Sequence, residues 1–157
     1  MSAALLDELD LRAPDAAATQ AIAVRLAAVA LPGDVLCLWG ELGAGKTQFA
    51  KGFGAGLGIT DTINSPTFVL MAEYRGRLPL FHLDLYRLDD ARDALAGGLL
   101  DEREGTGVTL IEWPDRMRDL LPNARLDISI EGVGDEPRTI RLATADPSLR
   151  RYLAAVR

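Results

Sequence analysis

The 157-residue sequence has a single cysteine, a single histidine and no long hydrophobic run. Because Cys37 stands alone, an internal disulfide and a cysteine-based metal cluster are excluded, and its place in an apolar run predicts a small buried side chain. No apolar run approaches the roughly 20 residues that a membrane-spanning helix needs. Residues 1–8 lack a basic region and carry acids early, so no secretory signal peptide is expected. These features predict a protein of the reducing cytoplasm.

Positive charge is also in short supply, with 17 Lys and Arg against 23 Asp and Glu and a formal net charge of −6. This balance argues against broad electrostatic capture of nucleic acid, although it leaves room for a local basic patch or for work on RNA through a partner. The hydrophobic content of 48% is typical of a globular protein. The length predicts one domain over 1–157, with a core of about five to seven strands and little space for a second substrate-binding domain.

One glycine-rich stretch dominates what is present. Gly-Glu-Leu-Gly-Ala-Gly-Lys-Thr at 40–47 fits G-x-x-x-x-G-K-[ST], the phosphate-binding P-loop. The apolar run at 34–39 predicts a short buried strand before it, and a helix is predicted from 46, ending within 52–58. A strand, a glycine loop and a helix in this order are the context that the motif needs, which disfavours a chance glycine turn.

The residue types of the loop match the chemistry of phosphate binding. Backbone N–H groups around a glycine-rich loop, together with a helix N-terminus, attract an anion. Lys46 can reach the β- and γ-phosphates, and one such charge pair at about 4 Å is worth roughly 4 kcal/mol before desolvation. The Thr47 hydroxyl suits Mg²⁺, which prefers hard oxygen donors. The predicted nucleotide-binding residues of the loop are Glu41, Leu42, Gly43, Ala44, Gly45, Lys46, Thr47 and Gln48. The motif does not say which nucleotide is bound.

Strand and helix patterns alternate early in the chain, and strands dominate late. The predicted strands lie within 5–11, 34–39, 65–74, 78–84, 108–112, 126–131 and 139–143, and the predicted helices are at 15–30, from 46 and at 89–96. We therefore predict the α/β class and a P-loop NTPase fold, with a mainly parallel sheet, an antiparallel extension and flanking helices.

Two acids end predicted strands and are candidates for the metal side of the site. Glu112 closes the apolar strand 108–112, where a P-loop enzyme needs an acid that holds Mg²⁺ or its waters. The alternative is a surface carboxylate that only ends a strand. Asp84 closes the strand 78–84 and suits either a second metal-shell acid or a group that orients water; pairing with Arg87 or capping of a turn is nearly as well supported.

Three further features stay open on local grounds. The Ser65-Pro66-Thr67 segment lies where a switch loop would sense a γ-phosphate, but it also fits a turn. Trp113 follows Glu112 and would cover a nucleotide, dock a partner or plug the strand end. His82 cannot build a metal site alone, and an inward-facing structural histidine is the favoured interpretation.

Four signatures, in this order, resemble one family, the small bacterial P-loop ATPases named TsaE or YjeE. They are Gly-Glu-Leu-Gly-Ala-Gly-Lys-Thr at 40–47, Ser-Pro-Thr-Phe at 65–68, His-Leu-Asp-Leu-Tyr-Arg-Leu at 82–88 and Ile-Glu-Trp-Pro at 111–114. Each is weak alone except the P-loop, but the set is specific in so short a chain. The resemblance covers about 34–115, and Gln48 departs from it where many relatives carry threonine.

The resemblance implies a Mg²⁺-dependent ATPase that works with the TsaB–TsaD complex, which transfers a threonylcarbamoyl group to adenosine 37 of tRNA. The tRNA would be reached through these partners, and no membrane is involved. By resemblance, the catalytic residues are Lys46, Asp84 and Glu112; the metal residues are Thr47, Glu112 and Asp84; and Ser65, Thr67 and Trp113 join the loop in binding ATP.

Two other functions remain open from the residues alone. One is a small-molecule kinase, although no arginine-rich lid segment is found. The other is a nucleotide-gated binding module with negligible catalysis. The choice of ATP over GTP rests on the resemblance, because no base-reading motif such as Asn-Lys-x-Asp is present.

Overall fold

The structure, a computed structural model, describes residues 6–41, 43–63, 71–86 and 105–157. The strands are β1 (Asp7–Ala13), β2 (Val35–Trp39), β3 (Met71–Tyr74), β4 (Leu80–Asp84), β5 (Val108–Glu112), β6 (Leu126–Glu131) and β7 (Arg138–Thr144). The helices are α1 (Ala16–Ala27), α2 (Lys46–Gly56) and α4 (Arg150–Ala155), with 3-10 helices at Pro114–Leu120 and Pro147–Leu149.

The strands form one sheet of seven, in the order β1-β7-β6-β2-β5-β4-β3. The four central strands, β6, β2, β5 and β4, are mutually parallel, whereas β1, β7 and β3 pair antiparallel at the two edges. The predicted α/β class, with a parallel core and antiparallel extension, is confirmed. The extension occurs on both edges, because the strands at 71–74 and 80–84 form a hairpin whose second strand joins the parallel core.

The strand that carries the P-loop lies in the middle of the sheet. β2 runs between β5 and β6, and residues 36–38 are buried, as its apolar sequence predicts. The predicted strands 108–112 and 126–131 are found with the same bounds. The helix predicted at 89–96 lies outside the described residues, and the C-terminal helix α4 was not predicted.

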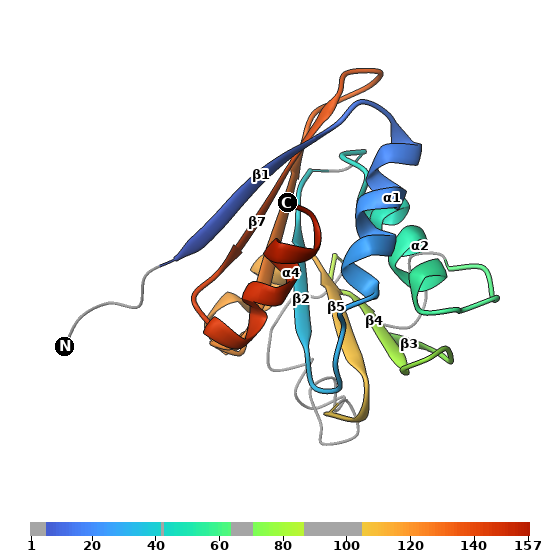
Figure 1. The fold of residues 1–157 in the computed structure, drawn as a ribbon, viewed down its shortest axis with the longest axis vertical. Helices are drawn as coiled ribbons and strands as arrows, with labels where there is room; N and C mark the ends of the chain where they lie inside the picture. The colour runs from blue at the N-terminus through green and yellow to red at the C-terminus, as the bar shows by residue number, and fades with distance from the viewer. Residues whose placement is uncertain (1–5, 42, 64–70, 87–104) are drawn as a thin grey trace.

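Helices α1 and α2 lie side by side on one face of the sheet (Figure 1). Asp15 caps α1, since its Oδ1 accepts a hydrogen bond of 2.8 Å from the Ala18 N–H. The two helices approach so closely at Gly52 that a Cβ there would come within 2.4 Å of the Gln20 carbonyl oxygen. Glycine at this position therefore sets the separation between α1 and the helix that follows the P-loop.

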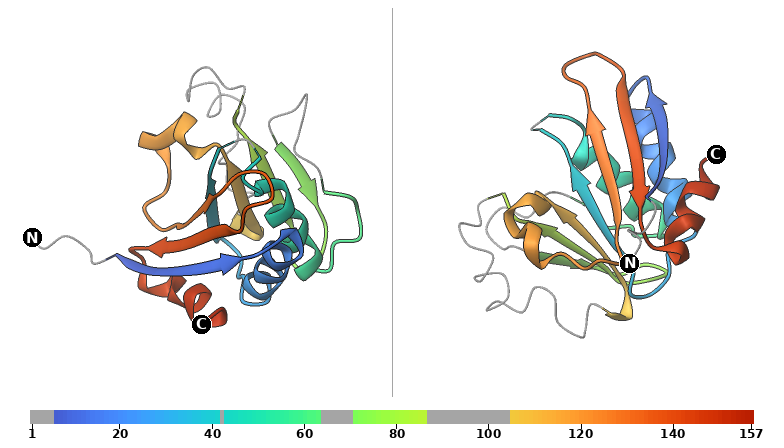
Figure 2. Two further views of the ribbon diagram at one scale, coloured as in Figure 1. Left: turned by 90° about the horizontal axis from the view of Figure 1, so that it is seen from above. Right: turned by 90° about the vertical axis from the view of Figure 1, so that its left-hand side faces the viewer.

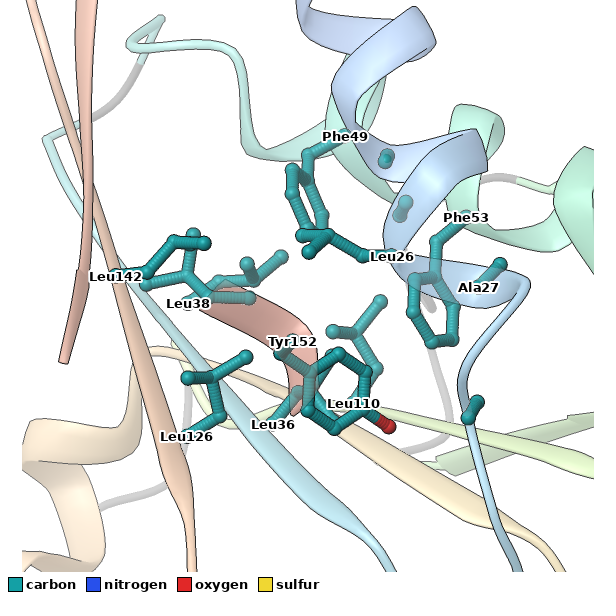
Figure 3. Packing of buried hydrophobic residues seen from close by; sticks show 14 of the residues in the cluster. Leu26, Ala27, Leu36, Leu38, Phe49, Phe53, Leu110, Leu126, Leu142 and Tyr152 are labelled. Carbon is teal, nitrogen blue, oxygen red and sulfur yellow. The ribbon is translucent and has the colours of Figure 1, made fainter. Parts of the chain in front are cut away.

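The main core fills the space between this helical layer and the sheet. Figure 3 shows Phe49 and Phe53 of α2 with Leu26 of α1, facing Leu38 and Leu110 from the central strands. The aromatic rings of α2 stack with their centroids 6.2 Å apart. Because these side chains are buried in the same cluster, the helix that begins at the P-loop is held firmly against β2.

A smaller core lies on the other face of the sheet. Its buried members are Cys37, Phe81, Leu83, Leu85, Ile111 and Leu121. Burial raises the pKa of the Cys37 thiol to about 12, so this cysteine is protonated and unreactive at neutral pH. The prediction of a small buried side chain at this position is confirmed.

Strand β2 is also anchored at its amino end. Asp34 accepts hydrogen bonds from the Leu31 N–H and from the Arg151 and Tyr152 side chains of α4. Tyr152 is fully buried, and burial, followed by its contact with Asp34, raises the pKa of the phenol above its usual range. The C-terminal helix is thereby fastened to the start of the P-loop strand.

The β6–β7 hairpin projects beyond the sheet toward the loop that links β1 to α1, as Figures 1 and 2 show. Its turn spans residues 132–137, as the sequence predicts. Among the described residues, no helix has the length and apolar character needed to cross a membrane.

Candidate functional site

A cavity of about 380 Å³ opens at the carboxyl ends of β4 and β5, beside the N-terminus of α2. This is the edge of an α/β sheet at which ligands bind. Its lining residues are Gly43, Gly45, Lys46, Thr47, Gln48, Asp84, Tyr86, Glu112 and Trp113. Three signatures that are far apart in sequence, the loop and the two that carry Asp84 and Glu112, therefore meet in one cavity.

The loop between β2 and α2 ends at Gly45, which has a φ of +114°. This backbone conformation is open to glycine and strained for residues with a Cβ. It turns the chain into α2, whose first N–H groups have no acceptors within the helix. Such an N-terminus, following a glycine-rich loop, is a site for anions and above all for phosphate.

Lys46 is the first residue of α2, and only 6% of its surface is exposed. Its Nζ donates a hydrogen bond of 2.6 Å to the Gly40 carbonyl and lies 3.5 Å from the ring centroid of Trp113. Burial lowers the pKa of the ammonium, while the charges of Glu112 and Asp84 oppose this shift. The ammonium is thus held inside the loop by one carbonyl and one aromatic face.

The two strand-end acids are direct neighbours. Asp84 of β4 pairs in register with Glu112 of β5, so their side chains leave the sheet on the same face. Burial raises the pKa of Asp84, and the negative charge of Glu112 adds to this effect, whereas the hydrogen bond of 3.0 Å from the Tyr86 N–H works against it. A buried and a half-buried carboxylate side by side form a site that favours a cation.

Glu112 is 2% exposed and has a histidine partner. Its Oε2 lies 2.6 Å from His82 Nε2, and His82 is fully buried. His82 and Asp84 are two residues apart on β4, so they lie on the same face of the sheet. The prediction of an inward-facing histidine is confirmed, and the contact with Glu112 places it at the site.

Trp113 has a φ of +58°, the only positive φ of a non-glycine residue in the described part of the chain. This left-handed conformation is costly for a bulky residue and is found preferentially at functional sites. The indole ring packs against Tyr86, with centroids 4.9 Å apart, and covers Lys46. The strained turn after β5 therefore brings an aromatic side chain over the end of the loop.

Arg138, the first residue of β7, fastens the outer side of the loop. Its guanidinium donates to the carbonyl oxygens of Ala44 at 2.9 Å and Gly43 at 3.1 Å. The same group donates to the Gly134 and Glu136 carbonyls of the β6–β7 turn. By holding these carbonyls, Arg138 ties the loop to the β6–β7 turn.

Two further cavities border the loop. One, of about 310 Å³, lies between the loop, the start of α1 and the β6–β7 turn, and shares Gly43, Gly45 and Gln48 with the first. In it, Gln48 accepts a hydrogen bond of 2.6 Å from Gln20 of α1. The other, of about 410 Å³, includes Glu41 and Trp39 and lies beside β6.

The structure brings most of the predicted site residues together. Gly43, Gly45, Lys46, Thr47, Gln48, Asp84, Glu112 and Trp113 all line the first cavity. Ala44 lines the other two cavities and Glu41 only the 410 Å³ one, so their side chains do not contribute to the first. Leu42, Ser65 and Thr67 lie outside the described residues.

Sequence reasoning missed three contributors to this region. His82 carried a usable signal, since it lies two residues before Asp84 in a strand and must share its face. Tyr86 lies within the 82–88 signature, but its ring contact with Trp113 did not follow from the sequence. Arg138 carried no signal, because it acts through backbone carbonyls 94 and 95 residues away in sequence. Such contacts depend on tertiary packing.

The donor set of the first cavity fits Mg²⁺. Thr47, Asp84 and Glu112 supply a hydroxyl and two carboxylates, which are hard oxygen donors. Within the described ranges, no group of three or more His, Cys, Asp or Glu side chains is arranged to hold an ion. The set therefore suits an ion that is shared with a bound phosphate, as Mg²⁺ is when it keeps only one or two protein carboxylates.

Comparisons with known proteins agree with this geometry. A family model described as "Threonylcarbamoyl adenosine biosynthesis protein TsaE" matches residues 13–140. The chain is similar to the tRNA threonylcarbamoyladenosine biosynthesis protein TsaE of Bacillus subtilis (strain 168), with 52% identity over 123 residues, 78% of this chain and 77% of that protein. The protein of the same name from Treponema pallidum (strain Nichols) is 46% identical over 111 residues, 71% of this chain and 82% of that protein.

A solved structure is similar over nearly the whole length. The crystal structure of YdiB from Bacillus subtilis superposes with a TM-score of 0.81 and 40% identity, and the match covers 96% of this chain and 94% of that one. The fold is therefore a P-loop NTPase fold, as the order of strand, loop and helix predicts. From the family model and from these identities, the chain belongs to the TsaE family.

Proposed function

We propose that this chain is a Mg²⁺-dependent ATPase that supports turnover of the TsaB–TsaD complex in threonylcarbamoylation of adenosine 37 of tRNA. The observation that carries the proposal is the cavity in which Lys46 and Thr47 of the loop meet the paired acids Asp84 and Glu112. The names of the relatives, which place those proteins in tRNA threonylcarbamoyladenosine biosynthesis, support the pathway and with it a cytoplasmic location.

The cavities suggest how the nucleotide lies. Its β- and γ-phosphates would rest on the N–H groups of the loop, with the Lys46 ammonium between them. The base and ribose would extend into the 310 Å³ cavity, because that cavity is continuous with the loop through Gly43, Gly45 and Gln48. Lys46 must then exchange its contact with the Gly40 carbonyl for phosphate oxygens.

Thr47, Asp84 and Glu112 would hold Mg²⁺, which neutralises the charge of the β- and γ-phosphate oxygens when bound. The same acids have a second task. A carboxylate with a raised pKa, such as Asp84, is suited to orient the attacking water and to accept its proton as the bond from the water oxygen to the γ-phosphorus forms and the bond to the β–γ bridging oxygen breaks, releasing ADP.

The arrangement supports slow hydrolysis by the chain alone. No arginine of the described residues lines the first cavity, and Arg138 is engaged with four backbone carbonyls of the loop and the β6–β7 turn. An arginine that stabilises the transition state accelerates phosphoryl transfer by roughly 10³–10⁵ in enzymes of this class. We propose that the partner complex supplies this charge or reorganises the loop to the same effect. The continuous sheet supports a single domain over 1–157.

The test is phosphate release from ATP and from GTP, with and without the purified TsaB–TsaD pair. We expect hydrolysis of ATP that rises at least 10-fold with the pair and is lost in Glu112→Gln. Full-rate turnover without partners would contradict the partner-dependent cycle, and transfer of labelled phosphate to a metabolite instead of water would indicate a kinase. If Thr47→Ala and Glu112→Gln leave the complex fully active while nucleotide remains bound, a binding module would replace the enzyme.

A further inference from the structure

The contact between His82 and Glu112 is a short, buried side-chain pairing inside the site. The two atoms, His82 Nε2 and Glu112 Oε2, are 2.6 Å apart, and the two residues are 0% and 2% exposed. His82 pairs in register with Leu110, and Glu112 pairs with Asp84, so the bond runs diagonally between neighbouring strands. Among the described residues, Nδ1 of this histidine has no hydrogen-bond partner.

We propose that His82 is a positioning residue for Glu112: its Nε2–H fixes the carboxylate in the orientation that receives the metal-bound nucleotide. The proposal deepens the function proposed above and rests on it for the role of Glu112. A glutamate side chain has three rotatable bonds, and holding one oxygen from the neighbouring strand restricts them. Residues that hydrogen-bond to a metal ligand without touching the metal orient that ligand, and their mutation costs about 10–100-fold in metal affinity.

The chemistry of the pair calls for a donor at this position. An ionised carboxylate only accepts hydrogen bonds, so a proton belongs on Nε2 of the imidazole. A buried carboxylate without a donor is costly, and the imidazole removes that cost. The imidazole thus positions Glu112 through one hydrogen bond from the neighbouring strand.

A purely structural histidine would have a different signature. Filling the space between the sheet and α2 contributes to the free energy of unfolding, and any side chain of similar size would serve. Positioning requires a donor at the place of Nε2. The two roles therefore separate in variants that keep volume but differ in where, or whether, they donate.

The experiment compares His82→Gln with His82→Asn. A glutamine amide nitrogen can reach the place of ring Nε2, whereas the asparagine amide is one bond shorter and falls near Nδ1. Binding of a fluorescent ATP analogue is titrated with Mg²⁺ at fixed pH, and circular dichroism and thermal unfolding report the fold. H82M, which keeps volume without a donor, replaces H82N should the latter not fold.

For H82N we expect the Mg²⁺ concentration at half-saturation to rise about 10-fold. We expect H82Q to stay within about 3-fold of the unsubstituted chain, and nucleotide affinity without Mg²⁺ to be unchanged in both. In an E112Q background the H82N effect on Mg²⁺ should disappear, because His82 acts through that carboxylate. An unchanged half-saturation in folded H82N or H82M, an equal loss in H82Q, or a full effect in E112Q would each overturn the proposal.

This readout is independent of hydrolysis. If the chain releases no phosphate from ATP even with its partners, the proposed ATPase function fails, while the Mg²⁺ titration still decides whether His82 positions Glu112. If the chain hydrolyses ATP and the Mg²⁺ titration shows no difference among the variants, the positioning role fails and the ATPase function stands.

Discussion

The two ends of strand β2 handle buried charge in opposite ways. At the amino end, Asp34 is 9% exposed and is met by the Leu31 N–H, the Arg151 guanidinium and the Tyr152 hydroxyl. At the carboxyl end, burial acts against the charged forms of Lys46 and Asp84, whose pKa values are lowered and raised respectively. At the amino end, the carboxylate has its hydrogen-bond donors within the chain. At the carboxyl end, a bound phosphate and metal ion would offset the cost of burying the charges.

This difference in hydrogen bonding distinguishes a structural carboxylate, Asp34, from the charged groups of the candidate site. A carboxylate that accepts three hydrogen bonds from its own chain holds its helix in place. Groups whose pKa values are displaced by burial and by a like charge are found preferentially at functional sites. In this protein the two arrangements lie beyond opposite ends of one strand, so each can be altered while the other serves as its internal reference.

Lys46→Ala should have the largest effect. It should lower ATP affinity and leave the stability of the fold unaffected. Removing the ammonium from the phosphates is expected to cost about 4 kcal/mol, or roughly 1,000-fold in ATP affinity. The stability of the nucleotide-free chain should not fall, because a desolvated charge is removed. Titration with a fluorescent nucleotide and thermal unfolding measure the two quantities. Lys51→Ala, on the same helix outside the cavity, is the control and should change neither.

Asp34→Ala should destabilise the fold by removing the contacts between the start of β2 and α4. Leaving Arg151 and the buried Tyr152 hydroxyl without their acceptor is expected to cost about 3 kcal/mol of unfolding free energy. Tyr152→Phe, which removes one hydrogen bond, should cost about 1 kcal/mol. Urea denaturation gives both values. Nucleotide affinity of the folded fraction should be retained, and a large loss of affinity would show that the two ends are coupled.

Arg138→Ala tests whether the loop depends on its outer clamp. Without donors for the Ala44 and Gly43 carbonyls, the loop should lose its fixed shape, and ATP affinity is expected to fall roughly 10-fold, or about 1.4 kcal/mol. Arg138→Lys should recover only part of the loss, since an ammonium lacks the planar fork. Isothermal titration calorimetry measures the affinity. Arg141→Ala, on the same strand and paired with Asp10, provides a matched control.

Asp84→Asn should have the smallest effect. It should slightly stabilise the nucleotide-free chain, whereas Asp34→Ala destabilises it. The pKa of Asp84 is raised in the folded state, so the folded chain binds this proton more readily than the unfolded chain does. Stability from this group is therefore present at low pH and is lost as pH rises from the usual aspartate value through the folded pKa. At pH values above that window, the asparagine variant should have a slightly higher melting temperature than the unsubstituted chain. At pH values well below the window, the two melting temperatures should be equal. A melting temperature that falls at neutral pH would contradict this sign.

Much of the fold followed from the sequence because local patterns were strong. The apolar runs of β2, β5 and β6 and the glycine loop before α2 carried their own signals, and their bounds were predicted closely. Helix α4 carried none, since six residues are too few for a clear pattern and their burial depends on Asp34. The positions of Asp84 and Glu112 at strand ends were predicted, but their pairing in register depends on β4 and β5 being neighbours.

By itself, the sequence determined the loop and the residues able to meet a phosphate and a metal, because these depend on residue type at short spacing. Only the tertiary structure decided which charges share a cavity. It placed His82 on Glu112, Trp113 over Lys46 and Arg138 behind the loop. The physical reason is that hydrogen bonds and desolvation act over a few ångströms in space, whereas these residues are 30, 67 and 94 positions apart in the chain.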